Sequence, residues 1–199
     1  MCGIIAAASN RNVGKLLVQG LHKMEYRGYD SAGIALHQTD QIAHLRTLGK
    51  VKLLEEKMIA EKPKSKLGIA HTRWATHGEP SEENAHPHMS NERVYIVHNG
   101  IIENYLDLKD FLKKEGYSFS SQTDSELIAH LLEYFLNKGN SMLDSMYLTK
   151  EKLDGAYAIA AIDKEDDQNI IIARSKSPLL IGIGMDEFLA ASDPLAIGQ

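Results

Sequence analysis

The order of strand-like and helix-like segments is the feature that most restricts how this chain can fold. Short apolar runs typical of strands cluster toward both ends of the sequence, and a block of three helix-like segments separates the clusters. A doubly wound sheet needs strands and helices in regular alternation, and this chain lacks that alternation. The pattern therefore predicts an α+β fold that is layered and built on antiparallel sheets.

The spacing of apolar residues predicts where the elements lie. Strands are expected at 2–8, 33–36, 41–48, 67–71, 93–98, 156–162, 170–173, 179–183 and 188–191. Helices are expected at 13–24, 51–60, 106–114, 124–137 and 142–153. The helix at 124–137 is the clearest, because its large apolar side chains share one face and Gly139 follows as a stop signal. The long polar segment between 71 and 93 is expected to be a functional loop.

Composition limits the partners and the compartment. The 199 residues have a formal net charge of −5 with scattered basic residues, which argues against nucleic acid or an anionic membrane as a partner. Cys2 is the single cysteine, so an internal disulfide is excluded and a reducing compartment, by default the cytoplasm, is expected. The sequence contains no apolar stretch near the ~18 residues that a membrane span requires, and no secretory signal.

Cys2 is the first candidate for chemistry. Removal of Met1 would place a thiol and a free α-amino group on one residue. An α-amino group has a reference pKa near ~7.7–8.0 and can serve as a base, which would make Cys2 a self-contained nucleophile. The alternative is a cysteine that only packs at the end of a strand.

Three further polar positions are candidates. A side-chain amide followed by a glycine N–H, as in Asn99-Gly100, can form an oxyanion hole, although Asn-Gly is also a common tight turn. Arg73 can clamp a carboxylate with two hydrogen bonds, with Thr76 completing the cradle, or it can make a surface ion pair. Asp124 can bind an ammonium group or cap the helix that follows it.

Five of the nine histidines lie between positions 71 and 98, which raises the hypothesis of a metal-dependent hydrolase. Zinc sites usually contain closely spaced ligand pairs, and only His86 and His88 are close here, on either side of a proline. A metal site is therefore not expected.

The motifs together resemble one family. They are M-C-G-I at 1–4, E-Y-R-G-Y-D-S-A-G at 25–33, H-T-R-W-A-T-H-G-E-P-S at 71–81, N-A-H-P-H at 84–88, V-H-N-G-I-I-E-N at 97–104, T-D-S-E at 123–126 and G-A-Y-A at 155–158. The chain resembles the N-terminal glutaminase domain of glutamine–fructose-6-phosphate aminotransferases, which are class II glutamine amidotransferases. The resemblance implies an N-terminal nucleophile hydrolase fold, a four-layer αββα sandwich with two antiparallel sheets.

The resemblance also implies a reaction and the residues that perform it. Glutamine would be hydrolysed to glutamate and ammonia through a γ-glutamyl thioester on Cys2. Asn99 and the Gly100 N–H would form the oxyanion hole, and Arg27 would support the surroundings of the nucleophile. No metal and no cofactor are implied.

Substrate binding follows from the same resemblance. Arg73, helped by Thr76 and His77, would hold the α-carboxylate of L-glutamine. Asp124 and the Gly100 carbonyl would hold the α-ammonium group. Trp74 would gate the passage of ammonia, and His86 would order the closing loop at 73–81.

The resemblance assigns residues 2–199 to a glutaminase domain that is truncated at its C-terminal end. The family continues into sugar isomerase domains, absent from this chain, which use the ammonia to convert fructose 6-phosphate to glucosamine 6-phosphate. The whole enzyme is expected to be a homo-oligomer, whereas a monomer stays open for this fragment. Two alternatives also stay open, namely the glutaminase domain of another class II amidotransferase and a catalytically silent module on the same fold.

Overall fold

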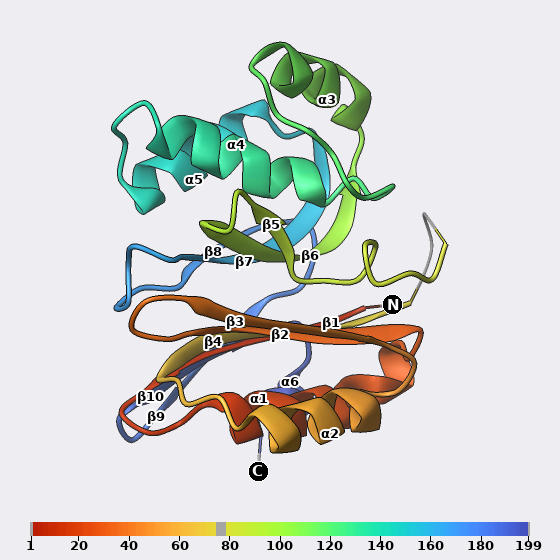
Figure 1. Cartoon of the computed structure of the whole chain (residues 1–199), viewed down its shortest axis with the longest axis vertical. Coiled ribbons are helices and arrows are strands. Elements are labelled where there is room, and N and C mark those ends of the chain that lie inside the picture. The colour runs from red at the N-terminus through yellow and green to blue at the C-terminus, as the bar shows by residue number, and fades with distance from the viewer. Residues whose placement is uncertain (1, 75–78, 199) are drawn as a thin grey trace.

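The structure of the chain is a computed structural model that describes residues 2–74 and 79–198. Four layers stack on one another, helix, sheet, sheet and helix, with the two sheets face to face in the middle (Figure 1). This arrangement confirms the predicted α+β sandwich with two antiparallel sheets.

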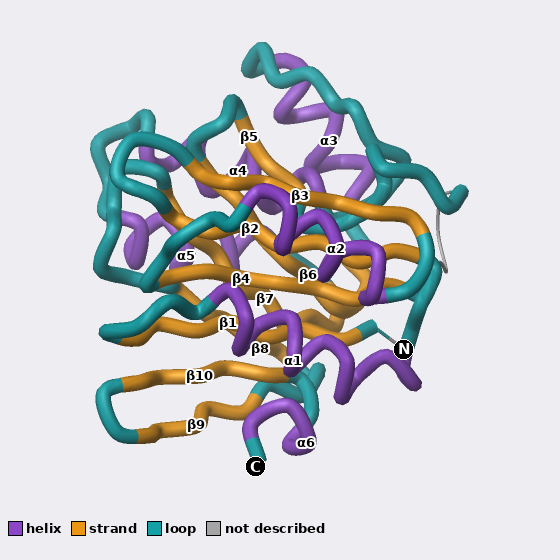
Figure 2. Tube along the Cα trace, turned by 60° about the horizontal axis from the view of Figure 1, so that its bottom comes forward, coloured by secondary structure: helices purple, strands orange, loops and turns teal. Residues whose placement is uncertain are grey.

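The first sheet has six strands in the described residues and contains the N-terminal strand near its centre. Its strand order is β3-β2-β4-β1-β10-β9. The strands are β1 (Gly3–Ser9), β2 (Ser31–His37), β3 (Ile42–Leu48), β4 (Leu67–Arg73), β9 (Leu180–Gly184) and β10 (Glu187–Ala191). Because β4 lies between β1 and β2, it is hydrogen-bonded along both edges. Figure 2 shows these strands from the side of α1 and α2.

The second sheet has four strands in the described residues, in the order β5-β6-β7-β8. They are β5 (His88–Ser90), β6 (Val94–Ile102), β7 (Gly155–Asp163) and β8 (Ile171–Ser175). The longest pairing joins β6 to β7 and runs from Val94 opposite Asp163 to Ile102 opposite Gly155.

Helices cover the outer face of each sheet. The first sheet is covered by α1 (Gly14–Met24), α2 (Val51–Glu61) and α6 (Pro194–Ile197), and a short 3-10 turn at Glu25–Arg27 follows α1. The second sheet is covered by α3 (Tyr105–Lys114), α4 (Glu126–Leu136) and α5 (Met142–Lys152). Helix α4 is buried on most sides and carries five large apolar residues, Leu127, Ile128, Leu131, Leu132 and Phe135, in the core beneath it.

A separate apolar layer fills the space between the two sheets. Strand side chains alternate between faces, so the neighbours on β1 go to different cores: Ile4 points into the layer between the sheets, and Ile5 packs toward α1. Many members of the layer between the sheets are small, among them Ala6, Ala158 and Ala160, and all three are buried. This layer holds the two sheets together.

Most expected elements are present, and three expectations need correction. The strand expected at 93–98 continues to Ile102, because Asn99 and Gly100 pair with β7 instead of forming a turn. The polar segment between 71 and 93 contains the strand β5, which pairs with β6. The helix expected at 124–137 begins at Glu126. Among the described residues, the structure has no helix with the length and apolar character needed to cross a membrane.

Candidate active site

Cys2 lies just before β1, next to the point where β4 ends. Its Sγ accepts a hydrogen bond from the Trp74 backbone N–H at 3.3 Å and lies 3.6 Å from the Trp74 carbonyl oxygen. Burial raises the pKa of the thiol, and the Trp74 N–H, Arg73 and Arg27 oppose this shift without cancelling it. The thiol is therefore protonated in the resting site and needs a base to become a nucleophile.

Two side chains hold the backbone of Cys2. Arg27 Nε and Asn99 Nδ2 each donate a hydrogen bond to the Cys2 carbonyl oxygen, both at 3.1 Å. Arg27 also makes a buried ion pair with Asp193, with 2.7 Å between Nη1 and Oδ2. The hydroxyl of Tyr26 donates to the same carboxylate oxygen. Arg27 thus contacts the main chain of Cys2, and its predicted supporting role stays a prediction.

Arg73 is the last residue of β4, and its side chain is buried although it carries a charge. The turn after α1 fixes this position, because Asp30 N–H donates to the Arg73 carbonyl at 3.0 Å and Gly28 lies against the Arg73–Trp74 backbone. Burial lowers the pKa of Arg73, and the electrostatic interactions of Arg73 with Cys2, Asp30 and Asp124 counteract part of that shift. A buried guanidinium at the mouth of the site suits recognition of a carboxylate.

Trp74 follows Arg73 and is half exposed, with its ring edge-on to Tyr29 at 5.5 Å between centroids. Thr76 and His77, the two other residues expected to help Arg73, lie outside the described residues. Their predicted roles stay predictions.

Asn99 and Gly100 lie on β6 of the other sheet, and the Asn99 side chain reaches Cys2 directly. Gly100 has a φ of 140°, a conformation that only glycine adopts readily. A Cβ at Gly100 would lie 1.9 Å from the Ala156 carbonyl oxygen, so β6 and β7 approach too closely for any side chain. Glycine is therefore required at the position directly after Asn99, where β6 takes this conformation and lies close to β7.

Asp124 is half-buried and does not cap α4. Its Oδ2 accepts a hydrogen bond from the Ile102 N–H at 2.8 Å, at the end of β6. Ser125 lies beside it and bonds His98 Nδ1 at 2.8 Å. The carboxylate therefore lies at the same end of β6 as Gly100, and the predicted alternative of a helix cap is wrong.

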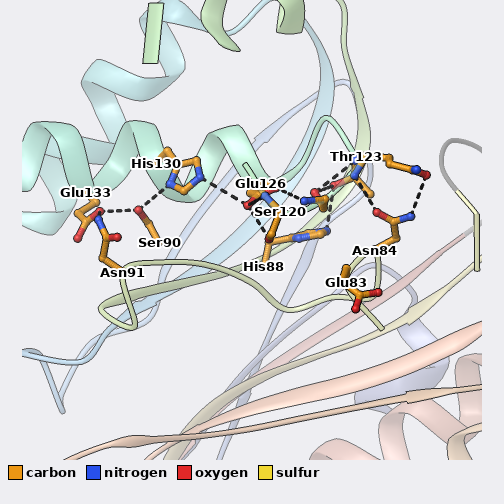
Figure 3. A network of polar contacts seen from close by, with 12 residues as sticks. Glu83, Asn84, His88, Ser90, Asn91, Ser120, Thr123, Glu126, His130 and Glu133 are labelled. Carbon is orange, nitrogen blue, oxygen red and sulfur yellow. Dashed lines mark hydrogen bonds and ion pairs between the residues drawn. The ribbon is translucent and has the colours of Figure 1, made fainter. Parts of the chain in front are cut away.

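A polar network holds the segment that carries Asp124 (Figure 3). Both oxygens of Glu126 accept hydrogen bonds from the preceding loop: Oε1 from the N–H and hydroxyl of Ser120, and Oε2 from the Ser121 N–H. Burial acts to raise the pKa of Glu126, but hydrogen bonds from His130, Ser120 and Ser121 outweigh it and lower that pKa. Glu126 is thus a buried carboxylate that orders the loop just before Asp124.

The same network joins this loop to the segment after Arg73 (Figure 3). The Asn84 side chain accepts from the Gln122 N–H at 2.8 Å and donates to Gln122 Oε1 at 3.3 Å. The Thr123 hydroxyl lies 3.0 Å from His88 Nε2. These contacts connect the two segments on which the expected ligands of the α-carboxylate and the α-ammonium lie.

Histidines form a stack beneath the site. The ring of His86 lies between those of His71 and His88, with centroid distances of 4.0 and 4.5 Å. All three are buried, and burial lowers the pKa of each. His86 therefore packs on His71 in the interior, and its expected effect on the loop at 73–81 is untested. Within the described residues, no group of three or more His, Cys, Asp and Glu side chains could hold a metal ion.

Two residues of the site escaped the sequence analysis. His71 appeared only as a member of a histidine-rich segment, and its Nε2 lies 2.9 Å from Asn99 Oδ1. Glu126 lies in the T-D-S-E motif at 123–126, which assigns it no role. The signal for His71 was its position two residues before Arg73, which places both side chains on one face of the same strand.

These residues can perform acyl transfer on an amide substrate. They comprise a cysteine at the start of a strand, an amide and a glycine on the opposite sheet, and an arginine and a carboxylate nearby. The two-sheet sandwich and this site define an amidotransferase of the N-terminal nucleophile type. The family of glutamine amidotransferase domains matches residues 71–199. The chain belongs to this family.

Relatives with curated names extend the match to almost the whole chain. The glutamine–fructose-6-phosphate aminotransferase [isomerizing] of Haemophilus ducreyi is 52% identical over 198 residues, which are 99% of this chain and 32% of that protein. The protein of the same name from Vibrio parahaemolyticus is 50% identical over the same shares. The chain thus resembles the N-terminal region of these proteins and spans about a third of their length.

A solved structure supports the fold. The glutamine phosphoribosylpyrophosphate amidotransferase from B. subtilis has a TM-score of 0.84 and 27% identity, and the match covers 98% of this chain and 42% of that one. The predicted family and the predicted N-terminal nucleophile fold are both confirmed.

Proposed function

We propose that this chain hydrolyses L-glutamine to L-glutamate and ammonia through a γ-glutamyl thioester on Cys2. The observation that carries the proposal is the position of Cys2, whose thiol accepts from the Trp74 N–H at the end of β4 and whose carbonyl accepts from Asn99 of the other sheet. We propose further that the whole protein delivers the ammonia to fructose 6-phosphate, forming glucosamine 6-phosphate on C-terminal isomerase domains. The names of the relatives support this second step.

The resting thiol requires a base, since burial raises its pKa. After removal of Met1, the α-amino group of Cys2 takes the thiol proton while sulfur attacks the side-chain carbonyl carbon of glutamine. The carbon–nitrogen bond then breaks, and ammonia leaves with the proton that the amino group returns. The amino group then takes a proton from water as the water attacks the thioester carbon; the carbon–sulfur bond breaks, glutamate is released, and the proton passes to the Cys2 sulfur.

Negative charge develops on the amide oxygen of glutamine during attack. The Asn99 NH₂ group has two hydrogens, and the Cys2 carbonyl occupies one of them. The second hydrogen, together with the Gly100 N–H, stabilises the oxyanion. Arg73 pairs with the α-carboxylate, and Asp124 and the Gly100 carbonyl pair with the α-ammonium. We propose the supporting roles predicted from the sequence for five further residues, namely Thr76, His77, Trp74, Arg27 and His86.

The single cysteine supports a reducing, cytoplasmic compartment for the proposed reaction. A homo-oligomer is proposed for the whole protein only.

The test uses the fact that Cys2 is the single cysteine in the chain. The wild-type chain should release ammonia from glutamine, should have the mass of a chain beginning at Cys2, and should take up one equivalent of a glutamine-like electrophile. Cys2→Ala should fold, with an unchanged circular dichroism spectrum, and should do neither reaction. Glutamine hydrolysis that persists in Cys2→Ala would overturn the proposal, and a wild type that retains Met1 and is inactive would favour a catalytically silent module.

A further inference from the structure

We propose that His71 is a positioning residue that holds the Asn99 amide with its nitrogen toward the Cys2 carbonyl and the developing oxyanion. The inference rests on the proposed function, since it concerns the donor to the oxyanion. His71 lies on β4 and Asn99 on β6, so the contact bridges the two sheets. The distance from His71 Nε2 to Asn99 Oδ1 is 2.9 Å.

The chemistry of the neighbours fixes which end of the amide faces which partner. A backbone carbonyl only accepts hydrogen bonds, so the atom of Asn99 that lies 3.1 Å from the Cys2 carbonyl oxygen must be the nitrogen. The amide oxygen then faces His71, and His71 Nε2 must carry a hydrogen. In the reverse orientation, two oxygens would repel each other at Cys2, and the nitrogen would face the imidazole.

The surroundings keep His71 in the required state. The side chain is 1% exposed, and burial, with smaller contributions from His98 and Arg73, lowers its pKa to about 3. The imidazole is therefore neutral near pH 7, and it has one N–H. The ring of His86 packs against it at a centroid distance of 4.0 Å, which limits rotation of the imidazole.

The consequence concerns the transition state. Without a donor at Nε2, the Asn99 amide keeps its hydrogen bond to the Cys2 carbonyl but loses the contact that holds its oxygen, so its second N–H is directed less firmly at the developing oxyanion. Binding of glutamine depends on other groups, Arg73 and Asp124 in the proposed site. Loss of the His71 donor should therefore lower kcat and leave KM nearly unchanged.

Two substitutions separate the donor from the volume of the side chain. His71→Gln keeps an N–H close to the position of Nε2, whereas His71→Met has similar size and no donor. We expect His71→Met to lower kcat for glutamine hydrolysis by about 10–100-fold with KM within about twofold, and His71→Gln to recover most of the loss. In an Asn99→Ala background, His71→Met should cause little further loss, because its effect passes through the Asn99 amide.

The wild-type protein provides a measurement that does not depend on the folding of a variant. Imidazole ¹⁵N shifts of His71 should report the neutral form protonated at Nε2 throughout pH 5–8. A charged ring, or the form protonated at Nδ1, would overturn the inference. The inference would also be overturned if His71→Met lowered kcat equally in the wild-type and Asn99→Ala backgrounds, or if it raised KM at constant kcat.

The failure of the inference can be told apart from failure of the proposed function. An active wild type whose His71→Met variant keeps full kcat refutes only the role of His71. A wild type that neither hydrolyses glutamine nor reacts at Cys2 with a glutamine-like electrophile refutes both.

Discussion

Replacing Gly100 by alanine tests how closely β6 and β7 must approach at the proposed oxyanion hole. The added Cβ would lie 1.9 Å from the Ala156 carbonyl oxygen and 2.8 Å from Tyr157 Cα. Both atoms belong to the backbone of the paired strand, so no side chain can turn away to make room. Carbon–oxygen contacts in sheets are about 3.3 Å or longer, and the strands would have to separate by roughly 1.4 Å.

The cost can be estimated from two contributions. A non-glycine residue held in a sparsely populated backbone region costs about 1–3 kcal/mol, and Gly100 has a φ of 140°. Separation of the strands would also break about two hydrogen bonds of the ladder, each worth about 1 kcal/mol. We expect Gly100→Ala to reduce the free energy of unfolding by about 3–5 kcal/mol.

Gly116 is the matched control. It has a φ of 95°, and its Cβ would meet nothing within 4 Å. Gly116→Ala therefore carries the backbone penalty without the close approach, and should cost about 1–2 kcal/mol. Urea unfolding followed by circular dichroism measures both variants, and ammonia release from glutamine measures activity.

The two glycine variants should also differ in activity. Gly116→Ala lies at the end of α3, away from the site, and should hydrolyse glutamine at the wild-type rate. Folded Gly100→Ala should lose activity, since Asn99 moves with the strand. The reasoning about close approach is refuted if Gly100→Ala destabilises the protein no more than Gly116→Ala does.

Three further predictions address the ion pairs and carboxylates of the site. Arg73→Ala should lower kcat/KM for glutamine by about 30- to several-thousand-fold, because the α-carboxylate of glutamine is then unpaired while its α-ammonium group stays bound to Asp124. The same variant should act on a small amide without an α-carboxylate nearly as well as the wild type does. Equal penalties on both substrates would show that Arg73 shapes the loop only. Glu126→Gln should cost about 1–3 kcal/mol in unfolding free energy, because an amide NH₂ would face a donor of Ser120 or Ser121. It should also raise KM for glutamine, and an unchanged KM would contradict the positioning of Asp124 by this network. The hydrogen bond from Tyr26, followed by those from Leu195 N–H and Arg27, lowers the pKa of Asp193. Its stabilising effect is thus complete above the unfolded pKa of ~3.9 and is lost as the pH falls through the lower folded value. Urea unfolding between pH 5 and 2 should show a shallower pH dependence for Asp193→Asn, and an identical slope would refute this.

The local pattern was enough to predict the layers but not the ends of the elements that form the site. Apolar runs identified β1, β7 and α4, because their buried residues follow one another at strand or helix spacing. Asn99-Gly100 has the local chemistry of a turn, and only pairing with β7 makes it part of a strand. Tertiary pairing overrides local preference here.

Asp124 and His71 show the same limit for side chains. Asp124 precedes a helix, which favours a cap, but its oxygen bonds the Ile102 N–H, 22 residues earlier in the chain. His71 bonds Asn99 across two sheets. Neither contact leaves a periodic trace in the sequence, whereas the motifs that resemble a family did point to Cys2 and Asn99, which the structure brings into contact.

The apolar layer between the sheets determines a chemical distance as well as stability. Cys2 belongs to one sheet and its amide partner Asn99 to the other, so the separation of sulfur and donor depends on how thick that layer is. Ala6, Ala158 and Ala160 keep it thin. A single added methyl group in this layer would push the two sheets apart and increase the distance between Cys2 and Asn99. Substitutions of buried residues that do not contact glutamine can therefore lower turnover. Screens for activity should therefore find such buried positions along β1 and β7, among them Ala158, which is paired with Asn99.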